Sequence, residues 1–167
     1  PKKKTKGKKK GEAEDEDNGL PPGIYGRIGV AVAPSNSSRV FALIEAEKGG
    51  LYRSDDGGES WELVNSGRYL QQRAWYFSVV RVDPKNSEVV YVSNVRLLKS
   101  VDGGKTFKNV GLKASEHIGQ IAVDPRNSDV VFVAAQGPLW APGGDRGLYK
   151  STDGGKNWKR VLNVDEW

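Results

Sequence analysis

The chain has 167 residues, enough for one domain with its own core, and its 21 glycines are typical of a protein rich in turns. It contains no cysteine, which excludes disulfides and cysteine-based zinc sites. The net charge of +5 is mild, and no apolar run approaches the roughly 18 residues of a membrane span, so we expect neither nucleic-acid binding nor a membrane-spanning segment.

The chain begins with a charged tail. Residues 1–10 hold seven lysines, and residues 11–17 hold five acidic residues. This composition predicts a disordered, solvated tail or loop over residues 1–23, with the folded part beginning near Ile24. A lysine run of this kind also occurs in nuclear localisation signals and phosphate-binding arms, and that alternative stays open.

The next segment contains four short runs rich in Val, Ile, Leu and Tyr, separated by Pro, Asn, Asp and Gly. Such runs predict strands joined by tight turns. We expect strands at residues 28–32, 40–44, 50–53 and 60–64. The same four-strand pattern returns twice, at residues 77–82, 89–92, 96–99 and 106–110, and at residues 118–123, 130–134, 147–150 and 157–162. No sustained helical period is present, so almost no helix is expected.

Between the third and fourth strand of each unit lies a repeated turn, at residues 54–61, 100–107 and 151–158. We call it the Asp-box turn: Ser stands first, Asp third, Gly fourth and fifth, and an aromatic residue eighth. The carboxylate can accept backbone N–H groups of its own turn, the glycines allow positive φ, and the aromatic ring can fill the gap between neighbouring units. These residues are therefore interpreted as structural: Ser54, Asp56, Gly58, Trp61, Ser100, Asp102, Gly104, Phe107, Ser151, Asp153, Gly155 and Trp158.

A metal or catalytic site at each aspartate is the alternative, but one carboxylate in a loop offers too few ligands for calcium. We expect no metal and no cofactor.

The spacing of the repeats indicates the fold. Ser54 and Ser100 are 46 positions apart, and Ser100 and Ser151 are 51 apart, which fits four strands a unit. Tandem four-stranded antiparallel units are the blades of a β-propeller. The predicted fold is all-β, a propeller segment of three blades at residues 24–66, 74–111 and 117–163. Propellers usually have four to eight blades, so the segment is expected to associate with remaining blades of a larger ring or with itself.

The units resemble the Asp-box (bacterial neuraminidase-type) repeats of sialidases, of xyloglucan-cleaving glycoside hydrolases and of sortilin-type receptor propellers. The resemblance is greatest to bacterial sortilin-like proteins labelled glycosyl hydrolases. Residues 50–54 and 146–151 carry it, and it extends over residues 24–161. The second unit departs from the pattern, since residues 96–98 read Arg-Leu-Leu in place of Gly-Leu-Tyr. The resemblance implies an exported protein, secreted or periplasmic, of bacterial type.

In a meander of four strands, the Asp-box turns share one rim with the turns between first and second strands. The opposite rim carries the irregular loops, and irregular loops on a repetitive scaffold are where binding residues tend to lie. Aromatic and cationic side chains there are candidates for ligand binding: Arg73, Trp75, Tyr76, His117, Trp140 and Arg146. The alternative interpretation is that they anchor the loops.

A hydrolytic glycosidase needs two positioned carboxyl groups, and Glu45 and Glu47 form the only tidy acidic pair at this rim. Paired surface glutamates are more often simply solvated. The first hypothesis is therefore a binding or scaffold propeller that recognises a glycan or peptide through this rim. The alternative is a fragment of a sialidase-like or xyloglucanase-like glycoside hydrolase whose catalytic carboxyls lie partly outside the chain.

Overall fold

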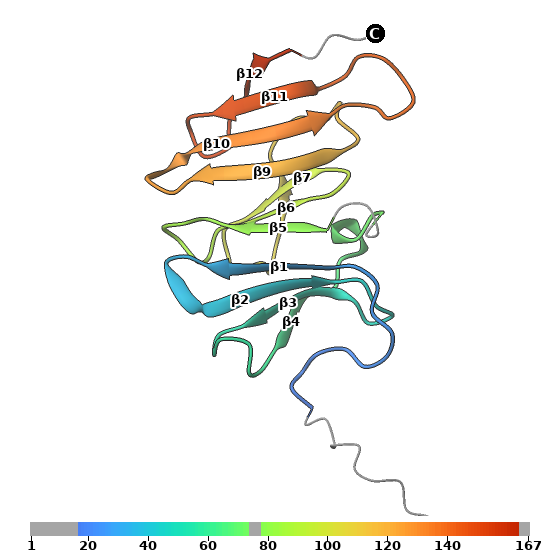
Figure 1. Ribbon diagram of the computed structural model, residues 1–167, viewed down its shortest axis with the longest axis vertical. Helices are drawn as coiled ribbons and strands as arrows, with labels where there is room; N and C mark the ends of the chain where they lie inside the picture. The colour runs from blue at the N-terminus through green and yellow to red at the C-terminus, as the bar shows by residue number, and fades with distance from the viewer. Residues whose placement is uncertain (1–16, 74–77, 164–167) are drawn as a thin grey trace, which may run out of the picture.

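The computed structural model describes residues 17–73 and 78–163. Figure 1 shows three β-sheets arranged one after another along the long axis of the molecule. Each sheet has four antiparallel strands in chain order, which confirms the predicted three blades. Among the described residues the one helical element is a 3-10 turn, η1 (Arg68–Leu70), and no helix there is long and apolar enough to cross a membrane.

Blade 1 consists of β1 (Ile28–Ala33), β2 (Asn36–Ile44), β3 (Gly50–Ser54) and β4 (Glu62–Asn65). Blade 2 consists of β5 (Val79–Val82), β6 (Val90–Ser93), β7 (Leu97–Ser100) and β8 (Lys108–Asn109). Blade 3 consists of β9 (Ile118–Asp124), β10 (Asn127–Gln136), β11 (Arg146–Ser151) and β12 (Lys159–Leu162).

The fourth strand of each blade begins two residues later than the sequence predicts. The reason lies in the Asp-box turn that precedes it. The backbone N–H groups of Ser60, Thr106 and Asn157 donate to the carboxylates of their own turns, so these residues belong to the turn and not to the ladder.

The first strand of each blade lies at the inner edge, where the three sheets meet. In Figure 1, β1, β5 and β9 occupy the middle of the assembly, and β5 contacts both of the others. The first strands of the three blades therefore lie next to one another.

Each blade has two faces, which we call the front face, toward the preceding blade, and the back face, toward the following one. The back face of blade 1 and the front face of blade 2 enclose one apolar core, which includes Phe41, Leu51 and Val80. The back face of blade 2 and the front face of blade 3 enclose a second core, which includes Tyr91 and Ile121. The cores therefore lie between blades.

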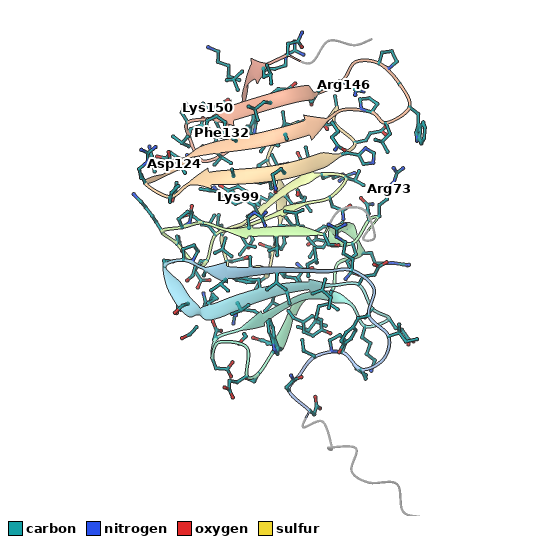
Figure 2. All side chains as sticks on the ribbon, viewed as in Figure 1. Arg73, Lys99, Asp124, Phe132, Arg146 and Lys150 are labelled. Atoms are coloured by element: carbon teal, nitrogen blue, oxygen red, sulfur yellow. The ribbon has the colours of Figure 1, made fainter. Side chains whose placement is uncertain are left out.

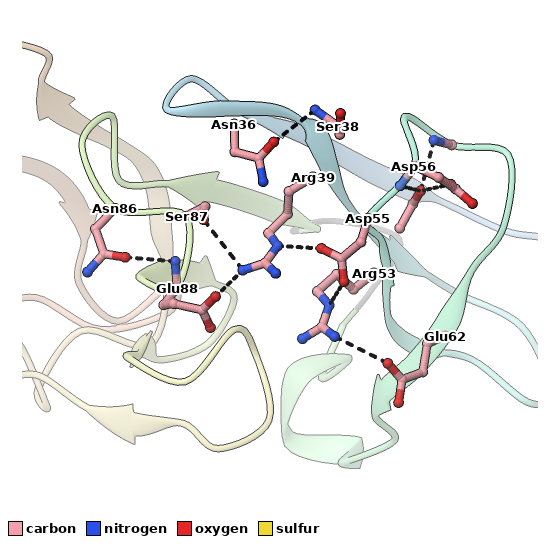
Figure 3. Close-up of polar contacts among 12 residues, drawn as sticks. Asn36, Ser38, Arg39, Arg53, Asp55, Asp56, Glu62, Asn86, Ser87 and Glu88 are labelled. Carbon is pink, nitrogen blue, oxygen red and sulfur yellow. Dashed lines mark hydrogen bonds and ion pairs between the residues drawn. The ribbon is translucent and has the colours of Figure 1, made fainter.

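Charged side chains cross the outside of the first interface (Figure 3). Arg39 of blade 1 donates from Nε to Asp55 Oδ1 at 2.6 Å and from Nη1 to Glu88 of blade 2. Arg53 donates to the other oxygen of Asp55 at 3.0 Å and to Glu62 at 3.3 Å. Because these pairs are partly exposed, they contribute little to stability and mainly set how blades 1 and 2 are positioned relative to each other.

The Asp-box turns are closed by their own serine and aspartate. In the second turn the Ser100 hydroxyl donates to Asp102 Oδ1 at 2.7 Å and accepts the Gly104 N–H at 2.9 Å. Asp102 also accepts the Thr106 N–H at 2.9 Å. The same bonds recur in the first and third turns. The prediction that each aspartate accepts N–H groups inside its turn is confirmed.

The aromatic residues of these turns are half-buried. Phe107 and Trp158 pack at the edges of the two inter-blade cores, where the fourth strand borders solvent. Trp61 packs on the front face of blade 1 against Ala42, Ile44 and Tyr52.

The packed part of the chain begins before Ile24. Leu20 packs beside Trp61 on the front face of blade 1, and the Trp61 N–H donates to the Asn18 carbonyl at 2.8 Å. Ile24 itself is exposed. Composition alone gave no sign of this because Leu20 is a single apolar residue in a charged segment.

Candidate functional site

The irregular connections lie on the rim opposite the Asp-box turns. In Figure 2, Arg73 and Arg146 lie at this rim, whereas Asp124, in the turn between β9 and β10, lies at the other. The rim is formed by residues 45–49, 112–117 and 137–145 and by the described part of the connection from β4 to β5.

Trp140 is the most prominent side chain of the rim. It is 91% exposed, at the tip of the loop between β10 and β11. An indole ring left this open on a folded protein offers a flat apolar surface to a ligand. Leu139 beside it is also exposed, which extends that surface.

The loop that carries Trp140 is held from both ends. Arg146 Nη2 donates to the carbonyls of Pro138 (2.7 Å) and Ala141 (3.2 Å). The Asp145 carboxylate accepts the Ala114 N–H at 2.8 Å, and the Asp145 N–H donates to the Ala114 carbonyl at 3.2 Å. These bonds tie the loop to the connection before β9.

A glycine is required at position 144 for this attachment. Its φ is +71°, and a Cβ there would lie 2.4 Å from the Ala114 carbonyl oxygen. The loop thus depends on Gly144, on Asp145 and on Arg146, of which only Arg146 was singled out from the sequence. For Arg146 the loop-anchoring interpretation fits its bonds, because its guanidinium points into the loop.

His117 and Arg73 meet at the middle of the rim. Arg73 Nη1 lies 2.9 Å from His117 Nε2, so the histidine accepts through Nε2 as a neutral ring. Burial lowers the pKa of His117, and the positive charge of Arg73 lowers it further, against the opposing effects of the Gly137 backbone hydrogen bond and Glu116. Arg73 is exposed and has φ of +55°, the left-handed region. The contact joins two candidates that are 44 positions apart.

Trp75 and Tyr76 lie outside the described residues. They remain predicted ligand-binding residues by their place in the sequence, directly after Arg73.

The two candidate carboxyl groups differ in their surroundings. Glu45 is half-buried, and its Oε2 accepts the Arg27 N–H at 2.9 Å. A Cβ at Gly26 would lie 2.4 Å from the same oxygen, so the carboxylate is packed against the segment that leads into β1. Glu47 is exposed in the turn between β2 and β3. Glu45 therefore holds the segment before β1 in place, and Glu47 is the solvated carboxyl group of the pair.

Two buried polar residues behind the rim escaped the sequence analysis. The Ser115 hydroxyl donates to the His117 carbonyl at 2.8 Å and accepts the Gly137 N–H at 3.1 Å. Asn94 accepts the Ile118 N–H through its backbone carbonyl at 3.1 Å. They join blade 2 and the Trp140 loop to the segment that holds His117. Small polar residues in loops give no sequence signal for such burial.

The rim therefore combines a rigidly anchored, exposed indole with a cation beside a neutral histidine. This arrangement suits binding of a ligand with flat apolar faces and polar edges. Among the described residues of the rim, no contact brings two carboxylate groups together.

Comparison with known proteins gives consistent matches. The family model described as Sortilin, neurotensin receptor 3 (Sortilin-Vps10) matches residues 49–165. A probable oligoxyloglucan-reducing end-specific xyloglucanase from Neosartorya fischeri is 34% identical over 128 residues, covering 71% of this chain and 13% of that protein. A xyloglucanase from Hypocrea jecorina is 30% identical over 105 residues, covering 52% of this chain and 12% of that protein.

A solved structure of an ancestral GH74 enzyme superimposes on the chain with a TM-score of 0.65 and 25% sequence identity, covering 87% of this chain and 19% of the enzyme. The chain thus spans about an eighth of the length of the two relatives and about a fifth of the superimposed structure. Because each match is to one part of a longer β-propeller protein, the comparisons support the fold of a propeller segment.

Proposed function

Because this chain belongs to the Sortilin-Vps10 family, we propose that it is the ligand-binding segment of an exported β-propeller and that it recognises a β-glucan of the xyloglucan type. Binding takes place on the rim opposite the Asp-box turns. The names of the two relatives, both xyloglucan-cleaving enzymes, suggest the class of ligand.

The exposed indole of Trp140 is the observation that carries this proposal. Sugar rings of a β-glucan have apolar faces that stack on aromatic rings, while their hydroxyl edges take hydrogen bonds. Trp140 offers the stacking surface on a loop that Arg146 and Asp145 hold in place. A preorganised loop loses little entropy when a ligand binds, which favours affinity.

Arg73 extends the surface toward blade 2. Its guanidinium is exposed and positioned against His117, so it can donate to sugar hydroxyls beside a ligand that stacks on Trp140. The neutral state of His117 leaves one positive charge at this point, which suits an uncharged polysaccharide better than a strongly acidic one.

The proposal is tested by calorimetric titration of the chain with xyloglucan oligosaccharides. Trp140→Ala is expected to weaken binding at least about tenfold, as loss of a central aromatic contact does. Val101→Ala is the matched control, because Val101 is also highly exposed but lies in the second Asp-box turn. Absence of binding, or equal affinity of wild type and Trp140→Ala, would refute the proposed function.

Glycoside hydrolysis is the second candidate, favoured by the same two relatives. It requires two carboxyl groups about 5–9.5 Å apart, with ligand between them. Of the two candidate carboxyl groups, that of Glu47 is exposed to solvent, whereas that of Glu45 accepts a hydrogen bond from the backbone N–H of Arg27. Release of reducing ends from xyloglucan, lost in Glu47→Gln and kept in Glu62→Gln on the fourth strand of blade 1, would establish this second function.

A further inference from the structure

The segment that precedes β1 contains the one Asn-Gly step of the sequence, at Asn18 and Gly19. In such a step the glycine nitrogen can attack the side-chain amide carbon of the asparagine, because glycine has no Cβ to hinder the approach. Asn18 is exposed, so water reaches its amide group. The groups around the nitrogen and the amide then decide how readily the two react.

Both reacting groups of this step have a partner that favours the reaction. The Gly19 N–H donates to Asp17 Oδ1 at 3.1 Å, so a carboxylate lies against the proton that must leave when the nitrogen attacks. Asn18 Oδ1 accepts the Leu20 N–H at 3.2 Å. Because negative charge develops on this oxygen during the attack, the N–H group stabilises the intermediate. The segment thus supplies a nucleophile, a base and an oxyanion donor.

Three Asp-Gly steps, which can form the same cyclic imide, have the opposite surroundings. They lie in the Asp-box turns, at residues 56–57, 102–103 and 153–154. The pKa of each aspartate is lowered by hydrogen bonds from its own turn, so the carboxyl group stays ionised and is a poor electrophile. The glycine N–H groups donate to backbone carbonyls, which are weak bases, of Ser38, Glu88 and Asp129.

The Asn-Gly step lies against blade 1 with no spare room. In Figure 1 the segment passes beside blade 1 and leads into β1. Gly19 has φ of +84°, and a Cβ there would lie 2.0 Å from the Trp61 carbonyl oxygen. On either side of it, the Asn18 carbonyl accepts the Trp61 N–H at 2.8 Å and Leu20 packs beside Trp61. A longer main chain between Asn18 and Leu20 would not fit these contacts.

We propose that Asn18 is a self-modifying site, at which deamidation to isoaspartate, with Asp17 as the base, releases residues 17–22 from blade 1. The Gly19 nitrogen bonds to Asn18 Cγ, Asp17 passes the proton of that nitrogen to Nδ2, and the Cγ–Nδ2 bond breaks to release ammonia. Water then opens the imide at either carbonyl, which gives isoaspartate or aspartate. One water is consumed and one ammonia is released.

Isoaspartate has a structural consequence that aspartate lacks. It routes the main chain through Cβ and Cγ and so inserts one carbon between the Cα of residue 18 and the nitrogen of Gly19. Gly19 and Leu20 therefore lose their places beside Trp61. The modification is independent of ligand binding, because it takes place on the segment before β1 and uses none of the residues proposed to contact a ligand.

Peptide mapping by mass spectrometry tests the reaction on the chain aged in neutral buffer. Labelling by protein isoaspartyl methyltransferase distinguishes isoaspartate from aspartate. Isoaspartate is expected to form at residue 18 at least about tenfold faster than at any of the three Asp-Gly steps. Asn18→Gln is expected to stay unmodified, because its longer side chain closes a ring much less readily. No isoaspartate at residue 18, or equal rates at the Asp-Gly steps, would overturn the proposal.

The role of Asp17 is tested by Asp17→Ser. The serine hydroxyl also accepts the Gly19 N–H but is not a base, so the reaction is expected to slow about tenfold to a hundredfold, up to the lower range of what a positioned base contributes. The difference should be largest at mildly acidic pH, where hydroxide is scarce. Glu116→Ser, at an exposed carboxylate before β9, is the control and should react as wild type. An unchanged rate in Asp17→Ser would overturn Asp17 as the base.

Hydrogen exchange tests the release of the segment. In the aged wild-type chain, the backbone N–H groups of residues 18–27 and of Trp61 are expected to exchange faster than in the fresh chain. Freshly prepared Asn18→Asp carries the new charge but keeps the length of the main chain, so it is expected to exchange as fresh wild type. Unchanged exchange in a chain that carries isoaspartate, or equally fast exchange in Asn18→Asp, would overturn release by the longer main chain.

Discussion

The first and second Asp-box turns have the same internal hydrogen bonds but different neighbours. Ser54 and Ser100 each donate to the aspartate two positions on and accept the N–H of the second glycine. The second turn is pressed against blade 1, since a Cβ at Gly104 would lie 2.6 Å from Leu51 Cδ2. At the equivalent Gly58 the nearest atom to such a Cβ is 3.7 Å away and belongs to the turn's own Trp61.

The difference separates two roles of one motif. The polar residues close the turn by themselves, whatever lies beside it, whereas the glycines, which lack a Cβ, allow a neighbouring blade to approach the turn closely. The indoles show the same division: Trp158 Nε1 donates to the Val110 carbonyl of the preceding blade, and Trp61 Nε1 donates to Gly58 of its own turn. Substitutions at equivalent positions should therefore have equal effects where they remove turn bonds and unequal effects where they touch the interface.

The largest expected effect is at the second glycine. Both Gly104 and Gly58 have positive φ, which costs alanine roughly 1–3 kcal/mol, but only Gly104 would also force Leu51 out of a full core, at roughly 1–3 kcal/mol more. We expect Gly104→Ala to lower the free energy of unfolding by about 2–6 kcal/mol. Urea unfolding measures this change in the free energy of unfolding.

Gly58→Ala is the matched control for this substitution. Only the backbone strain applies, so the expected loss is about 1–3 kcal/mol. Equal losses for the two variants would mean that blade 1 yields freely around Gly104, and the division between turn and interface would not hold.

Removal of the serine hydroxyl should act equally in both turns. Ser54→Ala and Ser100→Ala each leave a glycine N–H without its acceptor, and both serines are about 1% exposed. The expected loss is about 1–3 kcal/mol for each, the usual cost of a buried group left unsatisfied. Urea unfolding of the two variants side by side provides the measurement, and a loss at Ser100 alone would contradict the self-contained turn.

The sequence was sufficient to predict each blade, because turn bonds and strand pairing are local. Asp102, for example, finds its partners within four positions. What a blade packs against was not predictable in the same way. The half-exposure of Trp61 and the packing of Leu20 depend on which face has a neighbour, and no pattern in the blade itself encodes that.

For the candidate site, the sequence identified the rim but not its construction. Trp140 and His117 were found by residue type and place in irregular loops. The anchoring of the Trp140 loop through Asp145 and Ala114 joins segments 31 positions apart, and small residues that meet only in the fold leave no trace in spacing. The hydrogen bond by which Glu45 holds the segment before β1 likewise uses the backbone N–H of Arg27, which almost any residue at that position would supply.

Acidification should weaken all three turns together. The Thr106 hydroxyl and N–H and the Ser100 hydroxyl hold the pKa of Asp102 at about 2, and the pKa values of Asp56 and Asp153 are lowered by the same kinds of bond. A carboxyl whose pKa is lower in the folded than in the unfolded chain stabilises the fold above the unfolded pKa, about 4, and loses that contribution as the pH falls toward 2.

Urea midpoints measured from pH 7 to pH 2 are therefore expected to be level down to about pH 4.5 and to fall below it. The contribution of each aspartate is modest because the carboxylates are open to solvent and screened. Midpoints that stayed level to pH 2 would show that the turns do not depend on ionised aspartates.

The smallest expected effect is at two lysines that lie over aromatic rings, Lys99 over Tyr91 and Lys150 over Phe132. Lys99 and Lys150 both lie over a ring, but only Lys99 has the carbonyl of a following blade, at Gly154. Burial lowers the pKa of Lys99, against the raising effect of Asp83 and Asp129, so its charge is partly desolvated in the interface.

Methionine at position 99 keeps the apolar stem and removes both that desolvation cost and the hydrogen bond, and these two changes in free energy largely cancel. We expect Lys99→Met to lower the free energy of unfolding by less than about 1 kcal/mol and Lys150→Met to leave it unchanged within about 0.3 kcal/mol, both measured by urea unfolding. A loss for Lys150→Met as large as for Lys99→Met would mean that the ring contact and not the hydrogen bond to the Gly154 carbonyl carries the effect.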